Sequence, residues 1–471
     1  MRERKEITTR GAPGRLVYAA ALLLAACGSA NLDRRYDRML AETGRARPLS
    51  AIAADDGRAL FAGATTLERA AVVEAVLARN PDVEAARQAW RAALAGFPQA
   101  AALDDPMLSY SFAPLSIASD ARFGQRVELG QMLPFPGKKR LAGEVALAEA
   151  EAARGSFEAV RLELALMASN LYDDLYVAAR AIDVNRQHQE LLAKLKKSAE
   201  AQYAAGRAPH QDPLQAEVEL VHLERDRVVL ETDRDVVIAQ LNGLLHRRPE
   251  APLPVPPAEL PAPTPPPASA AELQDQALAA RPELRAQTAR IRGALAGIDA
   301  ARREYEPDFQ LMASYDWMWD TPEHRWMVGV GINVPLELGR RRAAVEQAES
   351  RSLATRSENE KLRDQIRVDV ASAALRAREG ARLVEIVEKR LLPAARDQVD
   401  ASIAGFVAGQ NAFLAVIEAE KNLREVELMR HSARADLDRR LAALDRALGR
   451  VPGMSSPART IDGEANLGED R

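Results

Sequence analysis

Apolar residues recur at helical spacing over two unusually long stretches of the chain. The first stretch has no proline between Gly137 and Arg207, and its apolar residues lie three or four positions apart, at Val160, Leu164, Met167, Leu171, Leu175, Ala178 and Ile182. This spacing predicts one helix with a coiled-coil seam over 138–203, roughly 90 Å long at about 1.5 Å per residue. A second such helix is predicted over 340–403, with a kink at Pro393 that the first helix lacks. Helices of this length indicate one elongated, mainly α-helical bundle.

Two shorter segments change to an apolar period of two. In 307–335 the alternating apolar residues are Phe309, Leu311, Ala313, Tyr315, Trp317 and Trp319, followed by Trp326, Val328, Val330, Ile332 and Val334. This pattern predicts a β-hairpin with one apolar face, and a weaker version predicts a second hairpin over 106–133. The fold class is therefore mainly α with a small β part.

The apolar face of these hairpins could cover a soluble core or could face lipid. We favour lipid, because the flanking coiled helices offer no core for a sheet to cover. Three tryptophans, Trp317, Trp319 and Trp326, would then form an aromatic belt at the membrane interface. Four strands are too few to close a membrane barrel, so the strands of several chains must combine.

The chain contains an internal duplication. Pro81, Pro106 and Pro134 each recur 201 positions later, as Pro282, Pro307 and Pro335, whereas Gly206 and Glu217 recur 203 positions later as Gly409 and Glu420. Ten prolines between 249 and 267 form an extended linker. The predicted boundaries are a signal peptide (1–27), an irregular strap (28–65), repeat 1 (66–248, with helices 138–203 and 212–245), the linker (249–268), repeat 2 (269–448, with helices 340–403 and 411–447) and a disordered tail (449–471).

The N-terminus has the features of an export signal. Several arginines precede an apolar run over 16–26, which is too short to span a bilayer. The run ends in Leu-Ala-Ala-Cys, and Cys27 is the only cysteine in the chain. This sequence resembles a bacterial lipoprotein box, which implies lipidation of Cys27; the alternative is a chance cysteine in an apolar run. Gly28, in a position where aspartate would retain a lipoprotein at the inner membrane, favours the outer membrane.

Charge and composition exclude several function classes. The 64 basic and 68 acidic residues leave no basic excess for nucleic acid, and no run of about 18 apolar residues predicts a membrane-spanning helix. A single cysteine removes any disulfide framework. The six histidines share no ligand spacing, and only His210 near Asp212 hints at a metal site. We therefore predict no catalytic site, no metal site and no cofactor.

The order of these elements resembles the TolC-type outer-membrane efflux factors. The resemblance covers about 66–448 and rests on the duplicated helix, hairpin, long helix, turn and returning helix. It also rests on local segments at Asn80-Pro81, Asp105-Pro106, 133–138, 335–339 and 391–393, and on the turns at Gly206 and Gly409. The Pro-Phe-Pro-Gly-Lys segment at 134–138 is most like the heavy-metal exporter branch of this family.

This resemblance implies a homotrimer, in which a trimeric α-helical tunnel carries a shared 12-stranded membrane β-barrel. Such a channel lies in the outer membrane of a Gram-negative bacterium, lipid-anchored and extending into the periplasm. It passively conducts substrate, with heavy-metal cations as one candidate, received from a periplasmic adaptor (membrane fusion) protein and an inner-membrane pump, for which the resemblance implies the RND type. The implied partners are these two proteins and outer-membrane lipid, with no nucleic acid.

The resemblance also assigns roles to residues at the two turns. Gly206, Arg207, Gly409 and Gln410 would form the periplasmic tip and contact the adaptor. Family members carry acidic rings after the turn glycine, and Asp212 and Glu418 are the acids at those positions here, which makes them candidates for a gate or selectivity filter. Asp212-Pro213 is equally typical of a helix N-cap followed by proline, and Glu418 of a solvated helical glutamate.

Three other functions remain open at this stage. A periplasmic adaptor lipoprotein also has a long helical hairpin, but it would not need two copies that each carry an apolar β-hairpin. A purely structural coiled-coil lipoprotein leaves the alternating aromatic strands unexplained. An outer-membrane duct for type I protein secretion has the same fold, so the sequence does not separate it from a small-molecule channel.

Overall fold

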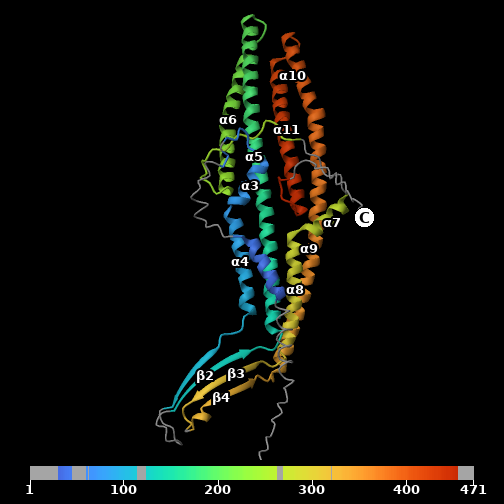
Figure 1. Ribbon diagram of the computed structural model, residues 1–471. Helices are drawn as coiled ribbons and strands as arrows, with labels where there is room; N and C mark the ends of the chain where they lie inside the picture. The colour runs from blue at the N-terminus through green and yellow to red at the C-terminus, as the bar shows by residue number, and fades with distance from the viewer. Residues whose placement is uncertain are drawn as a thin grey trace, which may run out of the picture. The chain divides into compact units, whose positions relative to one another are not determined.

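The computed structural model describes residues 30–44, 60–61, 63–113, 124–261, 269–319 and 321–454 (Figure 1). The first repeat contains α3 (Arg69–Arg79), α4 (Pro81–Ala101), β1 (Met107–Ala113), β2 (Gly124–Leu133), α5 (Lys138–Ala204) and α6 (Gln211–Leu244). The second contains α7 (Ala270–Ala280), α8 (Pro282–Arg303), β3 (Phe309–Asp316), η1 (Pro322–His324), β4 (Trp326–Ile332), α9 (Leu338–Ile386), η2 (Val387–Leu391), α10 (Leu392–Val407) and α11 (Phe413–Ala447). The mainly α-helical class with a small β part is confirmed.

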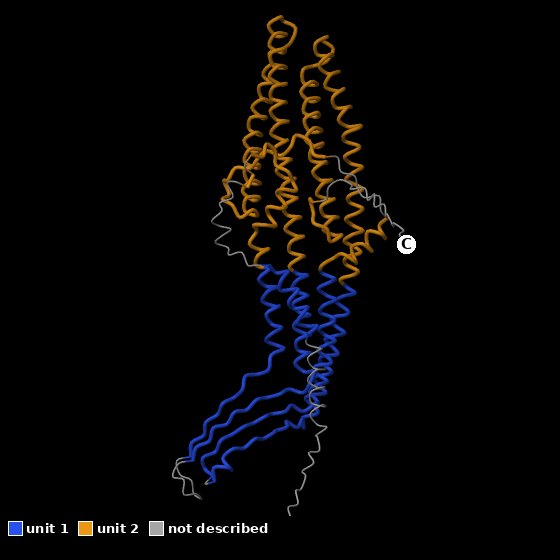
Figure 2. Tube along the Cα trace, in the orientation of Figure 1, with its two compact units in different colours: residues 1–46, 86–156, 283–361 blue, residues 47–85, 157–282, 362–471 orange. Residues whose placement is uncertain are grey.

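The chain forms two compact units, and each takes segments from both repeats (Figure 2). Unit 1 comprises 1–46, 86–156 and 283–361, and it contains the strands. Unit 2 comprises 47–85, 157–282 and 362–471, and it contains α6, α11 and the C-terminal part of α5. Each compact unit therefore combines segments of the two repeats, and neither unit coincides with one repeat.

All four strands of unit 1 form one antiparallel sheet in the order β1-β2-β3-β4. The two predicted hairpins are β1-β2 and β3-β4, and the β2-β3 pairing joins one repeat to the other. In the central register Leu129 lies opposite Ala313, and Ala313 lies opposite Val328. Cross-strand partners in an antiparallel sheet share a face, so this register decides which side chains lie together.

Unit 2 has a hydrophobic core where α3, α5 and α6 meet. Val72, Val76 and Leu241 are fully buried there, together with Tyr172 and Tyr176 of α5. The hydroxyl of Tyr172 donates a hydrogen bond of 3.0 Å to the Leu67 carbonyl, which satisfies its polar atom inside the core. This core holds the middle of the longest helix in the chain.

A short π-helical segment, η2, interrupts the second long helix immediately before Pro393. Proline has no backbone N–H and its ring crowds the preceding turn, so a helix must widen or bend around it. The helix predicted over 340–403 is therefore disrupted beside Pro393, where the sequence predicts a kink, and it divides into α9, η2 and α10. Repeat 1 has no proline at this position, and its α5 continues without a break.

The predicted irregular strap is wrong for its first part, because residues 30–43 are helical. Leu32 and Met39 are buried on one face of this helix, and the Tyr36 ring lies 5.2 Å from the ring of Phe97 in α4. Arg35 donates a 2.6 Å hydrogen bond to Glu151 of α5. Apolar packing and an ion pair thus hold this helix in place. The many charged residues of the segment obscured its apolar pattern in the sequence.

Candidate functional site

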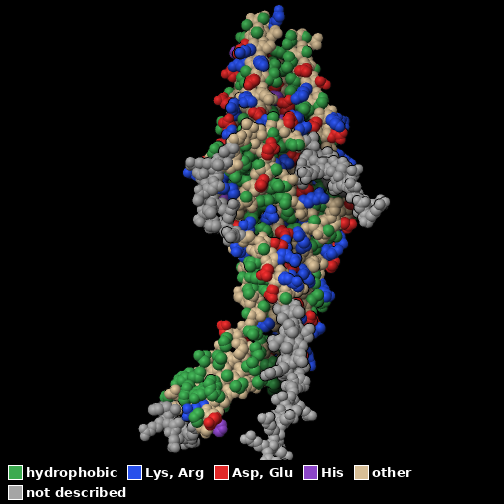
Figure 3. Space-filling view, in the orientation of Figure 1, with side chains coloured by type: hydrophobic (Ala, Val, Ile, Leu, Met, Phe, Trp, Pro, Cys, Tyr) green, Lys and Arg blue, Asp and Glu red, His purple; other side chains and the backbone are tan. Residues whose placement is uncertain are grey.

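The sheet of unit 1 presents one largely apolar face, which Gln125 and Gln131 of β2 interrupt. Its members come from all four strands: Leu108, Tyr110, Phe112, Val127, Leu129, Leu133, Phe309, Leu311, Ala313, Tyr315, Trp326, Val328, Val330 and Ile332. Val328 is 84% exposed and Val330 is 65% exposed. Figure 3 shows hydrophobic side chains gathered over the sheet. A contiguous exposed apolar surface of this kind marks contact with lipid or with another protein.

The opposite face of the same sheet carries most of its polar side chains. Its residues are Ser109, Ser111, Arg126, Glu128, Gly130, Gln310, Ser314, Asp316, Gly329 and Gly331, together with four methionines, Met107, Met132, Met312 and Met327. Arg126 and Glu128 form an ion pair of 2.5 Å on this face. Alternation between an apolar and a polar face is typical of strands that separate lipid from water.

Aromatic side chains cluster where β3 ends and β4 begins. The Tyr315 ring lies edge-on to Trp317 at 4.5 Å and to Trp326 at 5.0 Å, whereas Trp319 contacts His324. The alternating pattern predicted that Trp317 and Trp319 belong to the strand. The strand ends at Asp316, however, so both tryptophans lie in the connection between β3 and β4. All three tryptophans are exposed enough to meet an interface.

The helical hairpins of unit 2 end in two turns with the same construction. Gly206 and Gly409 have φ of 68° and 71°, which confirms the left-handed conformation expected of them. The backbone N–H of Arg207 donates to the Gln202 carbonyl at 2.8 Å, and that of Gln410 donates to the Gly405 carbonyl at 2.8 Å. Arg207 and Gln410 are both exposed beside their glycines.

A shared apolar cluster joins the two hairpins just behind these turns. Its members are Leu192, Leu195, Ala199, Ala216, Leu223, Phe406, Phe413, Val416 and Ile417. The rings of Phe406 and Phe413 lie 5.1 Å apart across the second turn, and the rings of Tyr203 and His210 lie 4.9 Å apart across the first. These ring pairs occupy equivalent positions of the two repeats, so the duplication extends to how each turn is closed.

The interpretation of Asp212 as a helix N-cap is wrong. The cap position of α6 is His210, whose backbone is already helical, and no side chain there makes a capping hydrogen bond. Asp212 instead lies inside the first turn, where the helix dipole favours a negative charge. The carboxyl is buried, and this burial raises its pKa. Glu418, the second gate candidate, is exposed on α11.

A buried charged cluster that the sequence did not reveal connects α5 to α11. The Nδ1 of His188 lies 2.6 Å from Glu420, and its Nε2 lies 3.0 Å from Glu427. Arg396 of α10 adds an ion pair of 3.3 Å with Glu427. Burial alone would lower the pKa of His188, but the hydrogen bonds to the two carboxylates outweigh it and raise the pKa to about 9. His188 is therefore a cation at neutral pH, and the same contact lowers the pKa of Glu427.

This cluster is a positioning device and not a metal centre. Opposite nitrogens of the imidazole contact the two carboxylates, so the ring itself separates them. Across the described part of the chain, no group of three His, Cys, Asp or Glu side chains is arranged to hold a metal ion. The two gate candidates of the single chain are not joined by any contact in this part either. Cys27, the predicted lipidation site, lies outside the described residues.

None of the helices in the described part of the chain combines the length and the apolar character that crossing a membrane requires.

Comparisons with known proteins show a similarity to outer membrane efflux proteins. Residues 273–450 match the family model described as outer membrane efflux protein. The cobalt-zinc-cadmium resistance protein CzcC of Cupriavidus metallidurans is 23% identical over 415 residues, covering 83% of this chain and 91% of that protein. These matches confirm the resemblance that the duplicated elements indicated.

Solved structures give the same result for the fold. The CusC channel aligns with a TM-score of 0.69 at 17% identity, over 82% of this chain and 93% of CusC. The open-state MtrE outer membrane channel of Neisseria gonorrhoeae aligns with a TM-score of 0.68 at 20% identity, over 83% of this chain and 91% of MtrE. The long helices and the four-stranded sheet therefore follow the architecture of these channels.

Proposed function

We propose that this chain is the outer-membrane channel of a tripartite efflux system, a proposal supported by the match of residues 273–450 to the outer membrane efflux protein model. The observation that carries the proposal is the sheet of unit 1, whose one face is largely apolar across all four strands and whose opposite face holds most of the polar side chains. The apolar face would contact lipid, and the polar face would line a path for water-soluble cargo.

The sheet also requires other copies of the chain. Within the described residues, β1 and β4 each pair on one side only, so both edges of the sheet expose backbone N–H and C=O groups. Such open edges do not occur within the hydrocarbon region of a bilayer, and closure removes them. Three copies joined edge to edge would supply the 12 strands of a shared barrel.

An apolar stripe on α6 supports the same association. Its residues are exposed and recur at helical spacing: Leu214, Val218, Val221, Val228, Val229 and Val236. A solvated helix face would carry polar side chains at these positions. In the proposed homotrimer this stripe packs against a neighbouring copy of the chain.

The proposed partners are a periplasmic adaptor and an inner-membrane pump of the RND type. The exposed turns at Gly206 and Gly409, with Arg207 and Gln410, are the proposed adaptor contacts. Trp317, Trp319 and Trp326 are the proposed aromatic belt, and Cys27 is the proposed lipid anchor. Heavy-metal cations are the proposed cargo, on the strength of the relative named for cobalt, zinc and cadmium resistance.

Export by living cells tests this function. Deletion of the gene should raise the cobalt and zinc retained by cells in metal-containing medium, and the intact gene should restore the lower level. Leu311→Arg, which puts a charge on the apolar face of a central strand, should not restore it, whereas Gln310→Arg on the opposite face should. Unchanged metal content in the deletion strain would refute metal export, and equal rescue by both variants would refute the lipid-facing assignment.

A further inference from the structure

Each strand of the sheet in unit 1 contributes one methionine to the face that holds most of the polar side chains. Met107 lies in β1, Met132 in β2, Met312 in β3 and Met327 in β4. The register places Met107 and Met312 in one row across the sheet, and Met132 and Met327 in the two rows that flank it. Residues from distant parts of the sequence thus form one cluster, which we call the methionine patch.

Polar side chains surround the methionine patch. The same three rows of this face carry polar side chains at Ser109, Glu128, Gln310 and Ser314. Met107 is 73% exposed and Met132 is 40% exposed, so packing in a core explains neither of them. An exposed apolar patch with a polar rim marks a place where another molecule binds.

Gly130 lies between Met107 and Met312 and leaves room above the sheet. The atom nearest to a Cβ added at Gly130 is Nε2 of Gln310, at 3.5 Å, so a flexible side-chain amide borders this space. Neighbouring strands lie about 4.8 Å apart, so Met107 and Met312 face each other across about 10 Å. Both side chains are unbranched and flexible, which allows their sulfur atoms to turn toward an ion above Gly130.

Met132 can supply a third sulfur atom. It lies on the same strand as Gly130, one row away, and is diagonal to both Met107 and Met312, a separation that long side chains bridge. The methyl group of Met312 lies 3.5 Å from a Cβ added at Gly329, so this side chain must change its rotamer to reach the same ion. Met312 is only partly buried, and rotamer changes are fast in side chains that no core encloses.

We propose that the methionine patch binds a soft monovalent cation, Cu(I) or Ag(I), through the sulfur atoms of Met107, Met132 and Met312. Thioether sulfur is a soft ligand and favours such ions, whereas hard cations prefer oxygen ligands. The proposal rests on the proposed function in one respect, because it requires that this face of the sheet lines a water-filled path. It adds a soft monovalent cation to the cobalt and zinc proposed as cargo.

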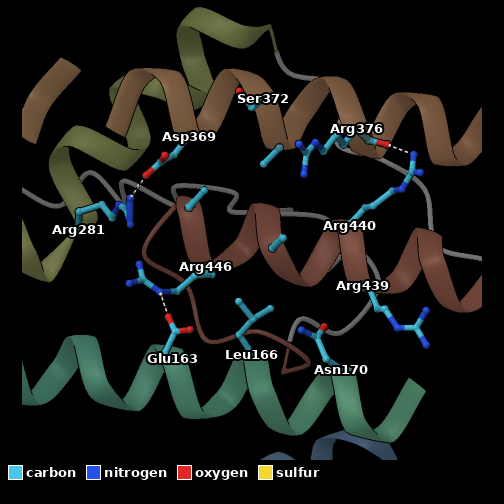
Figure 4. A pocket seen from close by; sticks show the side chains of 13 residues that line it. Glu163, Leu166, Asn170, Arg281, Asp369, Ser372, Arg376, Arg439, Arg440 and Arg446 are labelled. Atoms are coloured by element: carbon cyan, nitrogen blue, oxygen red, sulfur yellow. Dashed lines mark hydrogen bonds and ion pairs between the residues drawn. The ribbon is translucent and has the colours of Figure 1, made fainter. Parts of the chain in front are cut away.

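The cavity of unit 2 offers no competing site for a soft cation. This cavity of about 500 Å³ is lined by five arginines and two acids (Figure 4). Both acids are already paired, since Glu163 lies 3.2 Å from Arg446 and Asp369 lies 3.0 Å from Arg281. Carboxylate oxygens held by arginines would not select a soft cation. Binding that depends on methionine sulfur is therefore expected at the methionine patch.

Titration with Ag(I) tests the proposal. Full-length protein in neutral detergent, in a nitrate buffer without chloride or thiols, should bind silver nitrate saturably in calorimetry and should unfold at a higher temperature in its presence. The triple variant Met107→Leu, Met132→Leu, Met312→Leu should lose this binding, and each single variant should weaken it by about tenfold or more. Leucine keeps the apolar volume and removes the sulfur atom, so the variants are expected to fold.

Met429→Leu is the matched control, because Met429 is an exposed methionine of α11 outside the sheet. Cys27 is present in every variant and contributes equally to all titrations. Zinc binding should not differ between the triple variant and the control, since zinc sites use nitrogen, thiolate and carboxylate ligands.

Three outcomes would overturn the proposal. The first is the absence of saturable Ag(I) binding to the folded protein. The second is equal Ag(I) affinity of the triple variant and Met429→Leu, and the third is a loss of zinc binding in the triple variant that matches its loss of Ag(I) binding. Circular dichroism of each variant confirms that the protein measured is folded. Because these titrations measure binding, they can fail while cobalt and zinc export by cells stands, and a failure of that export leaves the binding result intact.

Discussion

Replacing His188 by leucine should loosen the contact between α5 and α11 behind the two turns. The imidazolium of His188 bridges Glu420 and Glu427, and the side chains of His188 and Glu420 are almost completely buried. Leucine has a similar volume but no charge. The substitution therefore leaves two carboxylates facing an apolar side chain without a cation between them.

The magnitude follows from the pKa of the histidine. A rise from the ordinary value near 6.5 to about 9 corresponds to about 3 kcal/mol of stabilisation of the folded state. Breaking a buried ion pair by removing one partner costs about 3–5 kcal/mol in other proteins, which is consistent. Because the folded pKa is raised, the contribution is complete below about pH 6.5 and is lost as the pH rises through about 9.

Hydrogen exchange of the purified protein measures this local stability. At pH 6.5, amides of α5 and α11 next to the cluster should exchange about 100-fold faster in His188→Leu than in the unmodified chain, after correction for intrinsic rates. At pH 10 the difference should shrink, because the imidazolium of the unmodified chain is then largely deprotonated. His222→Leu, at an exposed position of α6, should change neither value.

A double variant decides whether the pair is coupled. Adding Glu420→Leu to His188→Leu should recover part of the lost protection, since it removes one of the stranded carboxylates. The reasoning fails if the two substitutions destabilise additively, or if the exchange difference between His188→Leu and the unmodified chain is the same at pH 6.5 and pH 10.

Other residues of unit 2 yield three further predictions. Burial raises the pKa of Asp173 to about 7, although the positive charge of Arg69 opposes the shift. The contribution of Asp173 to the stability of the folded state therefore falls as the pH rises from about 4 to 7. In Asp173→Asn, the thermal unfolding midpoint should depend less on pH over this range. Gly409→Val should destabilise the protein by about 1–2 kcal/mol in denaturant unfolding, because valine is strained in the left-handed backbone conformation of Gly409. Gly409→Asn should cost less, since asparagine tolerates this conformation better. Steric overlap adds nothing, because no atom lies within 4 Å of an added Cβ. Phe413→Ala should cost about 3–5 kcal/mol in the same assay, whereas His210→Ala, at the equivalent but exposed position of repeat 1, should be nearly neutral.

Local pattern predicted the elements whose signal lies within one segment. The period of three to four residues in α5 and the period of two in β3 and β4 depend only on neighbours along the chain. The turn glycines were recognisable for the same reason, because glycine is the residue that adopts the left-handed conformation without steric cost. The lipid-facing assignment of the sheet stays a prediction, because it rests on the alternating pattern of the strands and on the absence of a core beside them in the sequence.

Features that depend on distant residues were missed or misread. His188 and Glu420 lie 232 positions apart, and only the packing of α5 on α11 brings them together. Asp212 fits a cap by sequence, but the chain is already helical at His210, so the backbone that a cap requires is absent. The helix over 30–43 did carry a signal, since Leu32, Tyr36 and Met39 are spaced four and three residues apart, and this pattern was obscured by the charged residues around it.

The most direct test of a shared barrel is the number of chains in the complex extracted from outer membranes. Native mass spectrometry of the full-length protein in mild detergent should give a mass of three chains, and heating should convert this species to single chains on a denaturing gel. A predominantly single-chain species, obtained under conditions that preserve known trimeric membrane channels, would contradict the account. The open edges of β1 and β4 would then have no partner, and the apolar face of the sheet would need another explanation.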